Sequence, residues 1–261
     1  MAKNPTHWHT RVKHWANLTP PYRPHPDSIA KQVELVGSDS QAVMVLGVTP
    51  ELTAAFNNVV AVDNTQVMID AFWPGDTETK RVINTDWFNT LDFTPTGIVG
   101  DLSLNLLFFP GHIKFLLQKL YDQMAPGAVF ACRVVARADK TITEQELIDL
   151  TETMSWHAWR LLFVQHIAGT EGASVFNFRK YTRFQELFPD RATLCARTGW
   201  DLHEVARSMD SYCGAPGCSA NPTRRQWQEQ IPKDAEAVQM IDVGDYELAE
   251  LCPILTFRKP V

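Results

Sequence analysis

Two short apolar segments with different endings constrain the fold of this chain most strongly. The first, residues 42–47, ends in Gly47, and the second, residues 59–63, ends in Asp63. Both have strand length and contain several valines, which is typical of neighbouring buried strands in a parallel sheet. A glycine lets the backbone approach a ligand closely, and a carboxylate can accept two hydrogen bonds from a ribose diol. The pair therefore predicts a nucleoside-binding crevice at the carboxyl ends of the two strands.

The segments that follow continue an alternating pattern of strands and helices. We expect strands over residues 81–84, 96–101 and 128–135, and helices over residues 27–36, 65–72 and 111–124. A further helix is expected after Pro50, because proline suits a first helical turn. Five strands joined by short connections that include helices predict a parallel sheet at the centre of the molecule.

The segments on either side of this core are predicted to have different roles. Residues 8–17 favour a short helix, and the prolines over residues 18–24 require an extended chain. Thr143 and Glu146 have the spacing of a capping box, which predicts a helix over residues 144–166. Short helices and loops are expected over 170–225, and two terminal strands over 237–243 and 251–257, joined through residues 244–246.

The predicted fold is a doubly wound, mostly parallel, Rossmann-like α/β sheet of seven strands with a terminal antiparallel strand pair. We expect one domain over residues 1–261. Its parts are an N-terminal cap (1–30), a core (31–138), a helical insertion after strand five (139–230) and the terminal strand pair (231–261).

Composition excludes several classes of partner. The 261 residues include 45% hydrophobic residues, enough for one substantial core, and the formal net charge is −6. A nucleic-acid backbone requires clustered Lys and Arg, so no nucleic-acid partner is expected. No apolar stretch reaches the length of a membrane span, and residues 1–5 do not begin a signal region. We expect a cytoplasmic monomer or homodimer without a membrane partner.

The five cysteines fit reduced thiols, because their number is odd. Cys213 and Cys218 have four residues between them, and no second Cys/His pair of matching spacing follows. A structural zinc site normally requires such a second pair. No metal site is therefore expected.

The order of motifs at the predicted strand ends resembles that of class I S-adenosylmethionine-dependent methyltransferases. Residues 43–51 resemble the glycine-rich first motif of the family, and residues 60–69 resemble its second motif, an acidic residue followed by a helix with a methionine. Residues 84–87 resemble the adenine-contacting segment of the family, and residues 98–105 resemble its fourth motif. Residues 125–130 resemble its turn into strand five. Residues 15–24 are similar to an N-terminal cap in a bacterial branch of such enzymes.

The resemblance implies S-adenosylmethionine as the cofactor. Asp63 would bind the ribose hydroxyls, and Asp86 would accept a hydrogen bond from the adenine amino group, with Trp87 or Met68 against the ring. The first motif departs from the family pattern, since residues 48–50 replace its later glycines. The implied cofactor-binding residues are Tyr22, Arg23, Gly47, Val48, Thr49, Asp63, Asn64, Met68, Asp86, Trp87, Asp101 and Leu102.

Two residues near the end of the fourth strand are candidates for catalysis. Asp101 ends this strand and could hold the ammonium group of the cofactor or orient the acceptor, and both roles remain open. His112 opens the following helix and is the candidate general base, because imidazole titrates near neutral pH. A structural or solvent-exposed role is the alternative for this histidine.

The insertion after strand five is the expected acceptor-binding side. Its candidate acceptor-binding residues are His157, Arg160, Arg179 and Tyr181. Trp156, Trp159 and Phe163 are expected to pack in its core. In the cap, Tyr22 and Arg23 either close over the cofactor or fasten the cap to the sheet, and both roles are compatible with a proline-stiffened segment.

Three functions remain in competition, in a stated order. The first is methyl transfer to a small-molecule acceptor by in-line displacement, in which the protein supplies positioning and dehydration. The second is a non-catalytic protein that binds S-adenosylmethionine or serves as a scaffold, because the first motif has few glycines. A nicotinamide-dependent oxidoreductase is the third, since Gly-x-Gly-x-x-Gly does not follow the first strand.

Overall fold

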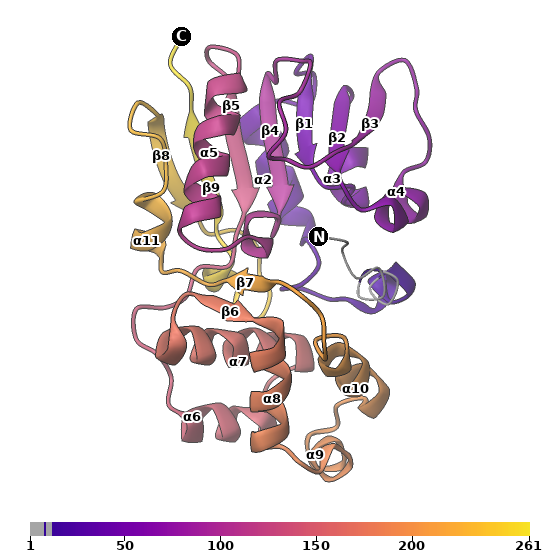
Figure 1. The fold of residues 1–261 in the computed structure, drawn as a ribbon, viewed down its shortest axis with the longest axis vertical. Coiled ribbons are helices and arrows are strands. Elements are labelled where there is room, and N and C mark those ends of the chain that lie inside the picture. Colours follow the sequence, from indigo (N-terminus) through magenta and orange to yellow (C-terminus); the bar gives the residue numbers. More distant parts are fainter. Residues whose placement is uncertain (1–7, 9–11) are drawn as a thin grey trace.

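A seven-stranded sheet forms the centre of the upper part of the molecule in Figure 1. The computed structural model describes residue 8 and residues 12–261. The strands are β1 (Val43–Leu46), β2 (Val59–Asp63), β3 (Lys80–Asn84), β4 (Gly97–Asp101), β5 (Val129–Arg133), β8 (Glu236–Ile241) and β9 (Ile254–Arg258). Their order is β3-β2-β1-β4-β5-β9-β8, with β1 to β5 parallel and β9 antiparallel to both of its neighbours. The predicted doubly wound sheet with a terminal antiparallel pair is confirmed.

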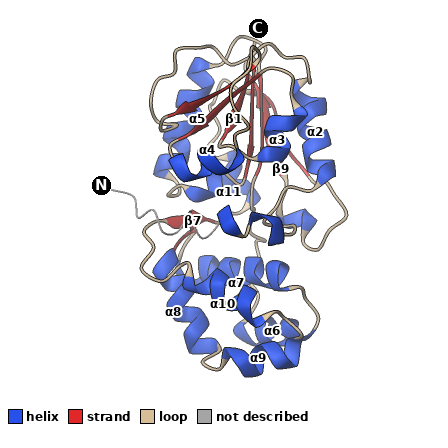
Figure 2. Ribbon diagram, turned by 90° about the vertical axis from the view of Figure 1, so that its right-hand side faces the viewer, coloured by secondary structure: helices blue, strands red, loops and turns tan. Residues whose placement is uncertain are grey.

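Helices cover both faces of this sheet (Figure 2). On one face lie α2 (Pro26–Val36), α3 (Pro50–Ala55) and α4 (Gln66–Phe72), and on the other α5 (Gly111–Gln123) and α11 (Arg224–Gln228). The central strands β1 and β4 are therefore buried on both sides, which explains their continuous apolar sequence. None of the helices in the described part of the chain is long and apolar enough to cross a membrane.

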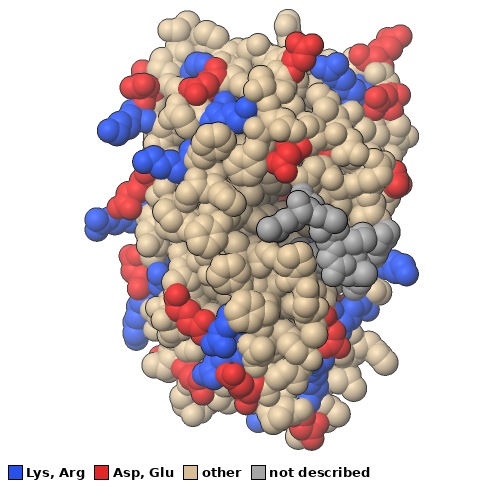
Figure 3. Space-filling model, viewed as in Figure 1, with Lys and Arg blue, Asp and Glu red and all other residues tan. Residues whose placement is uncertain are grey.

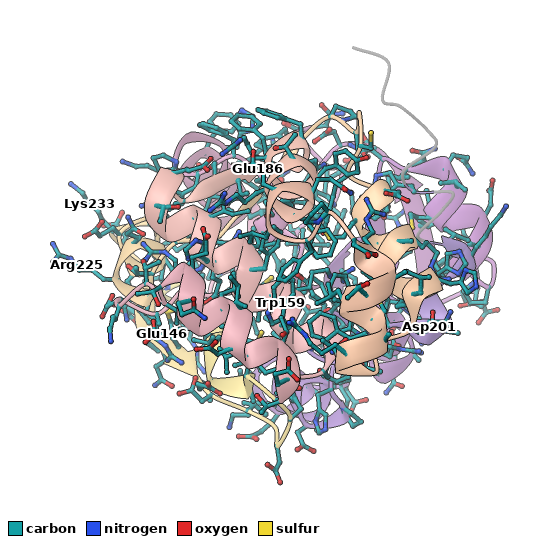
Figure 4. All side chains as sticks on the ribbon, turned by 90° about the horizontal axis from the view of Figure 1, so that it is seen from below. Glu146, Trp159, Glu186, Asp201, Arg225 and Lys233 are labelled. Carbon is teal, nitrogen blue, oxygen red and sulfur yellow. The ribbon has the colours of Figure 1, made fainter. Side chains whose placement is uncertain are left out.

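The insertion after β5 forms a helical subdomain with a core of its own. Its helices are α6 (Glu144–Asp149), α7 (Trp156–Glu171), α8 (Asn177–Leu187), α9 (Arg191–Thr198) and α10 (Leu202–Asp210). Figure 4 shows Trp159 among these helices, with Glu146, Glu186 and Asp201 toward the outside. Trp159 is fully buried and stacks on Phe163 at 5.3 Å. Large aromatic residues thus hold the subdomain together, as the sequence predicted.

Two short strands lie between the sheet and the helical subdomain in Figure 1. They are β6 (Ser174–Phe176) and β7 (Cys218–Ala220), which pair antiparallel. The sequence did not predict this pair, because each segment has only three residues. It connects the two parts of the molecule, since the Asn105 amide next to the sheet donates to the Ala220 carbonyl of β7 at 2.7 Å.

Some predicted boundaries were wrong, and one predicted helix is broken. The capping box of Thr143 and Glu146 is confirmed at α6, but this helix ends at Asp149 and the 3-10 turn η3 (Leu150–Glu152) follows. Ser155 then begins α7 by accepting a hydrogen bond from the Ala158 N–H at 3.4 Å. A second N-cap inside an apolar sequence separates the predicted helix over 144–166 into two.

The ends of the chain also differ from the predictions. The terminal strands begin and end at residues other than those expected, and the turn η4 (Ala249–Leu251) lengthens their connection. Residues 9–11 of the helix predicted over 8–17 lie outside the described residues. Its described end forms the 3-10 turn η1 (Trp15–Asn17).

Candidate functional site

A cavity of about 500 Å³ lies between the carboxyl ends of the parallel strands and the helical subdomain. Figure 1 shows the arrowheads of β1 and β4 directed toward this subdomain. The loops after β1, β2, β3 and β4 form one wall of the cavity, α7, α8 and α10 form the opposite wall, and the cap segment closes one side. A cavity of this volume at strand ends has the size and place of a small-molecule site in an open α/β sheet.

Gly47 and Asp63 meet at the rim of the sheet wall. Gly47 has φ +103°, a conformation that residues with a Cβ rarely adopt, and its N–H donates to the Val62 carbonyl at 2.9 Å. A Cβ at this position would lie 3.6 Å from Oδ2 of Asp63. The other carboxylate oxygen of Asp63 accepts the Thr65 N–H at 2.8 Å. The sheet therefore presents an oriented carboxylate beside bare backbone.

The next part of this wall combines a carboxylate with an aromatic ring. Asp86 accepts hydrogen bonds from the Asn64 amide at 2.6 Å and from the Phe88 N–H at 3.1 Å. The Trp87 indole N–H donates to the Val62 carbonyl at 2.6 Å, which fixes the plane of the ring. Met68 from α4 lines the cavity as well. This combination suits a flat heterocycle that carries a hydrogen-bond donor.

Asp101 is held in a buried ion pair. Its oxygens accept from Nε and Nη2 of Arg133 at 2.5 and 3.0 Å, and only 3% of its side chain is exposed. Burial by itself lowers the pKa of Arg133, but the charge and hydrogen bonds of Asp101 raise it overall, so the guanidinium stays charged. Arg133 also donates to the Pro21 carbonyl at 2.8 Å and to the Tyr246 hydroxyl at 3.3 Å. The ion pair of Asp101 and Arg133 therefore links the sheet to the cap.

The backbone after Asp101 is strained. Leu102 has φ +54°, a left-handed conformation that is unfavourable for a residue with a branched side chain. Its N–H donates to the Arg133 carbonyl at 2.8 Å, and the residue lines the cavity. Strain of this kind collects at ligand sites, where the surrounding structure maintains it.

The helical wall carries most of the positive charge of the cavity. Arg160 from α7 lies over the Tyr22 ring, with Cζ 3.9 Å from its centroid. The Lys180 ammonium from α8 donates to the side-chain amide oxygen of Asn177 at 3.0 Å and lies over the Tyr212 ring. Arg207 from α10 is paired with Glu204.

Most residues that the resemblance implied for the cofactor lie together around this cavity. They are Tyr22, Gly47, Val48, Thr49, Asp63, Asn64, Met68, Asp86, Trp87, Asp101 and Leu102. Arg23 does not line it, because its Nε is paired with Glu51 at 2.7 Å. Arg160, one of the candidate acceptor-binding residues, lines the opposite wall.

The structure places the other candidate residues elsewhere. His112 is exposed on the first turn of α5, where its ring packs edge-on against Phe88 and Phe108 at 5.7 and 6.1 Å. It is not among the described residues that line the cavity, because this turn directs the ring toward the outer surface.

The face in Figure 3 carries its charged side chains mainly toward the edges, around a broad uncharged area.

The remaining acceptor-binding candidates also do not line the cavity within the described chain. Arg179 is paired with Glu171 on the surface, and Tyr181 packs against the core of the helical subdomain. His157 is buried behind the wall, where its Nδ1 lies 2.7 Å from the Thr19 hydroxyl. Burial lowers the pKa of His157 to about 3, and the charges of Arg160 and Arg207 contribute to this shift.

Several cavity residues were missed by the sequence analysis. They include His14, Trp15, Asn177, Lys180, Arg207 and Tyr212. No local motif distinguishes them from surface or packing residues. Tertiary packing alone brings α10 and the segment before β7 over the strand ends.

Comparisons with known proteins concern the fold. By sequence, the chain matches no protein-family model and no curated protein. By structure, it is similar to N-methyltransferase NodS from Bradyrhizobium japonicum WM9 in complex with S-adenosyl-L-homocysteine, with TM-score 0.50, 10% identity, and coverage of 96% of this chain and 97% of that one. A Listeria monocytogenes protein provisionally described as an S-adenosylmethionine dependent methyltransferase gives TM-score 0.50, 12% identity, and coverage of 90% and 98%.

A third similar structure carries a different description. A Rhodobacter sphaeroides protein provisionally described as a Zn-dependent alcohol dehydrogenase gives TM-score 0.57, 12% identity, and coverage of 98% of both chains. At these identities the likeness extends to the fold and not to the reaction, so the activity has to be argued from the site. The sheet order and these likenesses together show that the chain has the α/β fold of class I S-adenosylmethionine-dependent methyltransferases.

Proposed function

We propose that this protein binds S-adenosylmethionine and transfers its methyl group to a small-molecule acceptor. One observation carries the proposal: Gly47, with φ +103°, and the Asp63 carboxylate lie side by side at the ends of adjacent parallel strands, at the rim of the cavity. A carboxylate in this place accepts hydrogen bonds from both ribose hydroxyls of a nucleoside.

The other groups of the sheet wall fit the rest of this cofactor. Asp86 accepts from the adenine amino group, and Met68 and Trp87 provide apolar contacts beside the ring. The backbone around Gly47 and Leu102 leads from the ribose site toward the helical wall, where the methionine part of the cofactor extends. These assignments are supported by the shared lining of one cavity.

The acceptor side of the cavity supports a small substrate. The cofactor supplies an electrophilic methyl group on a sulfonium, which becomes a neutral thioether after transfer. The chain holds the acceptor in line with this methyl group and excludes water, and positioning of this kind lowers the barrier without a covalent intermediate. Asp101 is committed to Arg133 and His112 lies outside the cavity lining, so we propose no general base from either residue.

The test is calorimetric binding of S-adenosylhomocysteine to the wild type and to Asp63→Ala. Loss of charge-assisted hydrogen bonds to two hydroxyls should weaken binding by about 2–3 kcal/mol, roughly 30- to 150-fold. Asp70→Ala is the matched control, because Asp70 is exposed on α4 and bonds only Gln66 among the described residues. Equal affinity of the Asp63 variant and the wild type would reject the ribose assignment.

A further inference from the structure

Among the residues that the structure describes, Arg160 is a buried cation in the helical wall without an anionic partner. Only 6% of the residue is exposed, and its buried Nε has no hydrogen-bond partner in the described chain. Within the part of the chain that the structure describes, no carboxylate lies within 4.0 Å of its guanidinium. The residue nevertheless lines the cavity. A buried charge is costly unless it is paired, so a ligand that supplies the missing anion would be stabilised here.

Neighbouring residues prepare Arg160 for such a ligand. The Tyr22 ring lies under the guanidinium, with Cζ 3.9 Å from the ring centroid, and this contact restrains the cation without using its N–H groups. Glu204, which lines the same cavity, is paired with Arg207 and lies 3.5 Å from His157 Nε2. The low pKa of His157 reflects, besides burial, the positive charges of Arg160 and Arg207.

We propose that Arg160, stacked on Tyr22, forms a carboxylate-binding subsite of the cavity. The planar fork of a guanidinium matches the two oxygens of a carboxylate, which it can bind in a bidentate manner. This inference deepens the proposed function and rests on it, because the carboxylate belongs either to the methionine part of the cofactor or to the acceptor.

The position of the subsite explains why both sources have to be tested. Leu161, the next residue of α7, packs in one cluster with Tyr22 and Leu102. Arg160 therefore stands near the end of β4, where the amino-acid end of the cofactor and the acceptor have to approach each other. The two sources share the same chemistry at Arg160.

The first arm of the experiment compares two adenosine thioethers by calorimetry. S-adenosylhomocysteine contains the carboxylate, and 5′-methylthioadenosine lacks the amino-acid part. If the cofactor supplies the carboxylate, Arg160→Gln should weaken the binding of S-adenosylhomocysteine at least tenfold. It should weaken the binding of 5′-methylthioadenosine less than twofold. Arg225→Gln is the matched control, because its side chain is 87% exposed on α11.

The second arm tests the acceptor as the source. Protein saturated with 5′-methylthioadenosine is titrated with benzoate, phenylacetate and indole-3-acetate, and with the corresponding neutral amides. If the acceptor supplies the carboxylate, the wild type and Arg225→Gln should bind at least one acid tenfold more tightly than its amide. Arg160→Gln should lose this preference.

Arg160→Lys guards against an effect of misfolding. It keeps the charge but not the planar fork, so in the arm that responds we expect an affinity between those of the wild type and Arg160→Gln, at an unchanged melting temperature. The inference is overturned if Arg160→Gln equals Arg225→Gln in both arms, or if the lysine variant behaves as the wild type. If the wild type binds neither adenosine compound, the proposed function is rejected. The acids and amides can then be titrated without an adenosine compound, and this comparison still tests whether Arg160 binds a carboxylate.

Discussion

His157 is held neutral by its surroundings rather than by a hydrogen bond to a carboxylate. The Thr19 N–H donates to its Nδ1 at 3.3 Å, so this nitrogen carries no proton. Its Nε2 is buried 3.5 Å from Glu204 and has no hydrogen-bond partner among the described residues. Burial lowers its pKa to about 3, and the positive charges of Arg160 and Arg207 add to the shift. The helical wall therefore tolerates a neutral imidazole and opposes a charged one.

This shift predicts a loss of stability in mild acid. The unfolded chain binds a proton at His157 near its ordinary pKa of about 6.5, whereas the folded protein does not until about pH 3, so stability falls as the pH drops below 6.5. Between pH 7.5 and 5.5 the wild type should lose about 1.4 kcal/mol more free energy of unfolding than His157→Asn. The asparagine keeps an acceptor for Thr19 and does not titrate.

Urea unfolding at the two pH values measures this difference directly. Titration of the other side chains contributes to both proteins and cancels in the comparison. Parallel losses of stability in the variant and the wild type would show that His157 is protonated in the folded state at pH 5.5.

At the scale of the elements, the break between α6 and α7 sets the position of Arg160. Ser155 caps the N-terminus of α7 five residues before Arg160, and the hydrogen bond from the Ala158 N–H fixes this start. A continuous helix from residue 144 would lack the 3-10 turn η3, which redirects the chain before α7. The local cap thus determines the direction in which the helical wall runs.

Removal of this cap should destabilise the helical subdomain. We expect Ser155→Ala to lower the free energy of unfolding by about 1 kcal/mol, since a helix N-terminus then loses one of its few hydrogen-bond acceptors. Ser155→Asn, which can still cap, should remain within about 0.5 kcal/mol of the wild type. Chemical denaturation followed by circular dichroism distinguishes the variants. Similar stability of the alanine and asparagine variants would mean that packing alone starts α7.

At the scale of the whole molecule, two hydrophobic cores enclose one binding cavity. The core on the α5 face of the sheet and the core of the helical subdomain consist of different residues. The cavity lies between them, with Asp63 on one wall and Arg160 on the other. A ligand that touches both walls therefore couples the stability of the two parts.

The proposed function predicts stabilisation of the whole protein by its product. S-adenosylhomocysteine at about 100 times its dissociation constant should raise the free energy of unfolding by about 2.7 kcal/mol, since it binds only the folded state. Urea unfolding with and without the ligand measures the increase. For Asp63→Ala at the same ligand concentration the gain should fall to about 0.3–0.9 kcal/mol, because the ligand is then at only about 0.7–3 times its dissociation constant. An increase of the same size in both proteins would mean that the ligand stabilises the protein without a contribution from Asp63.

The amino-acid sequence was sufficient to predict the parallel sheet and the edge at which Gly47 and Asp63 lie. Strand-length apolar segments, proline positions and caps act over a few residues, so they predicted β1 to β5 and placed Gly47 and Asp63 at strand ends. Because the carboxyl ends of parallel strands meet at one edge, the rim followed without knowledge of the helices. The break at residues 150–155 was missed, because apolar residues on both sides of it, Leu147 before and Trp156 after, continue the apolar pattern.

The side chains that form the opposite wall, and the ion pair of Asp101, became known only from the packing of the folded chain. Arg160 and Arg179 are both cations of the insertion, yet one lines the cavity and the other pairs with Glu171 on the surface. Asp101 is paired with Arg133, 32 residues away in the chain. The difference between Arg160 and Arg179 depends on how helices rotate and cross when their cores pack, and hydrophobic periodicity does not specify either property. The ion pair depends on the register of β4 and β5, which places Asp101 opposite Arg133.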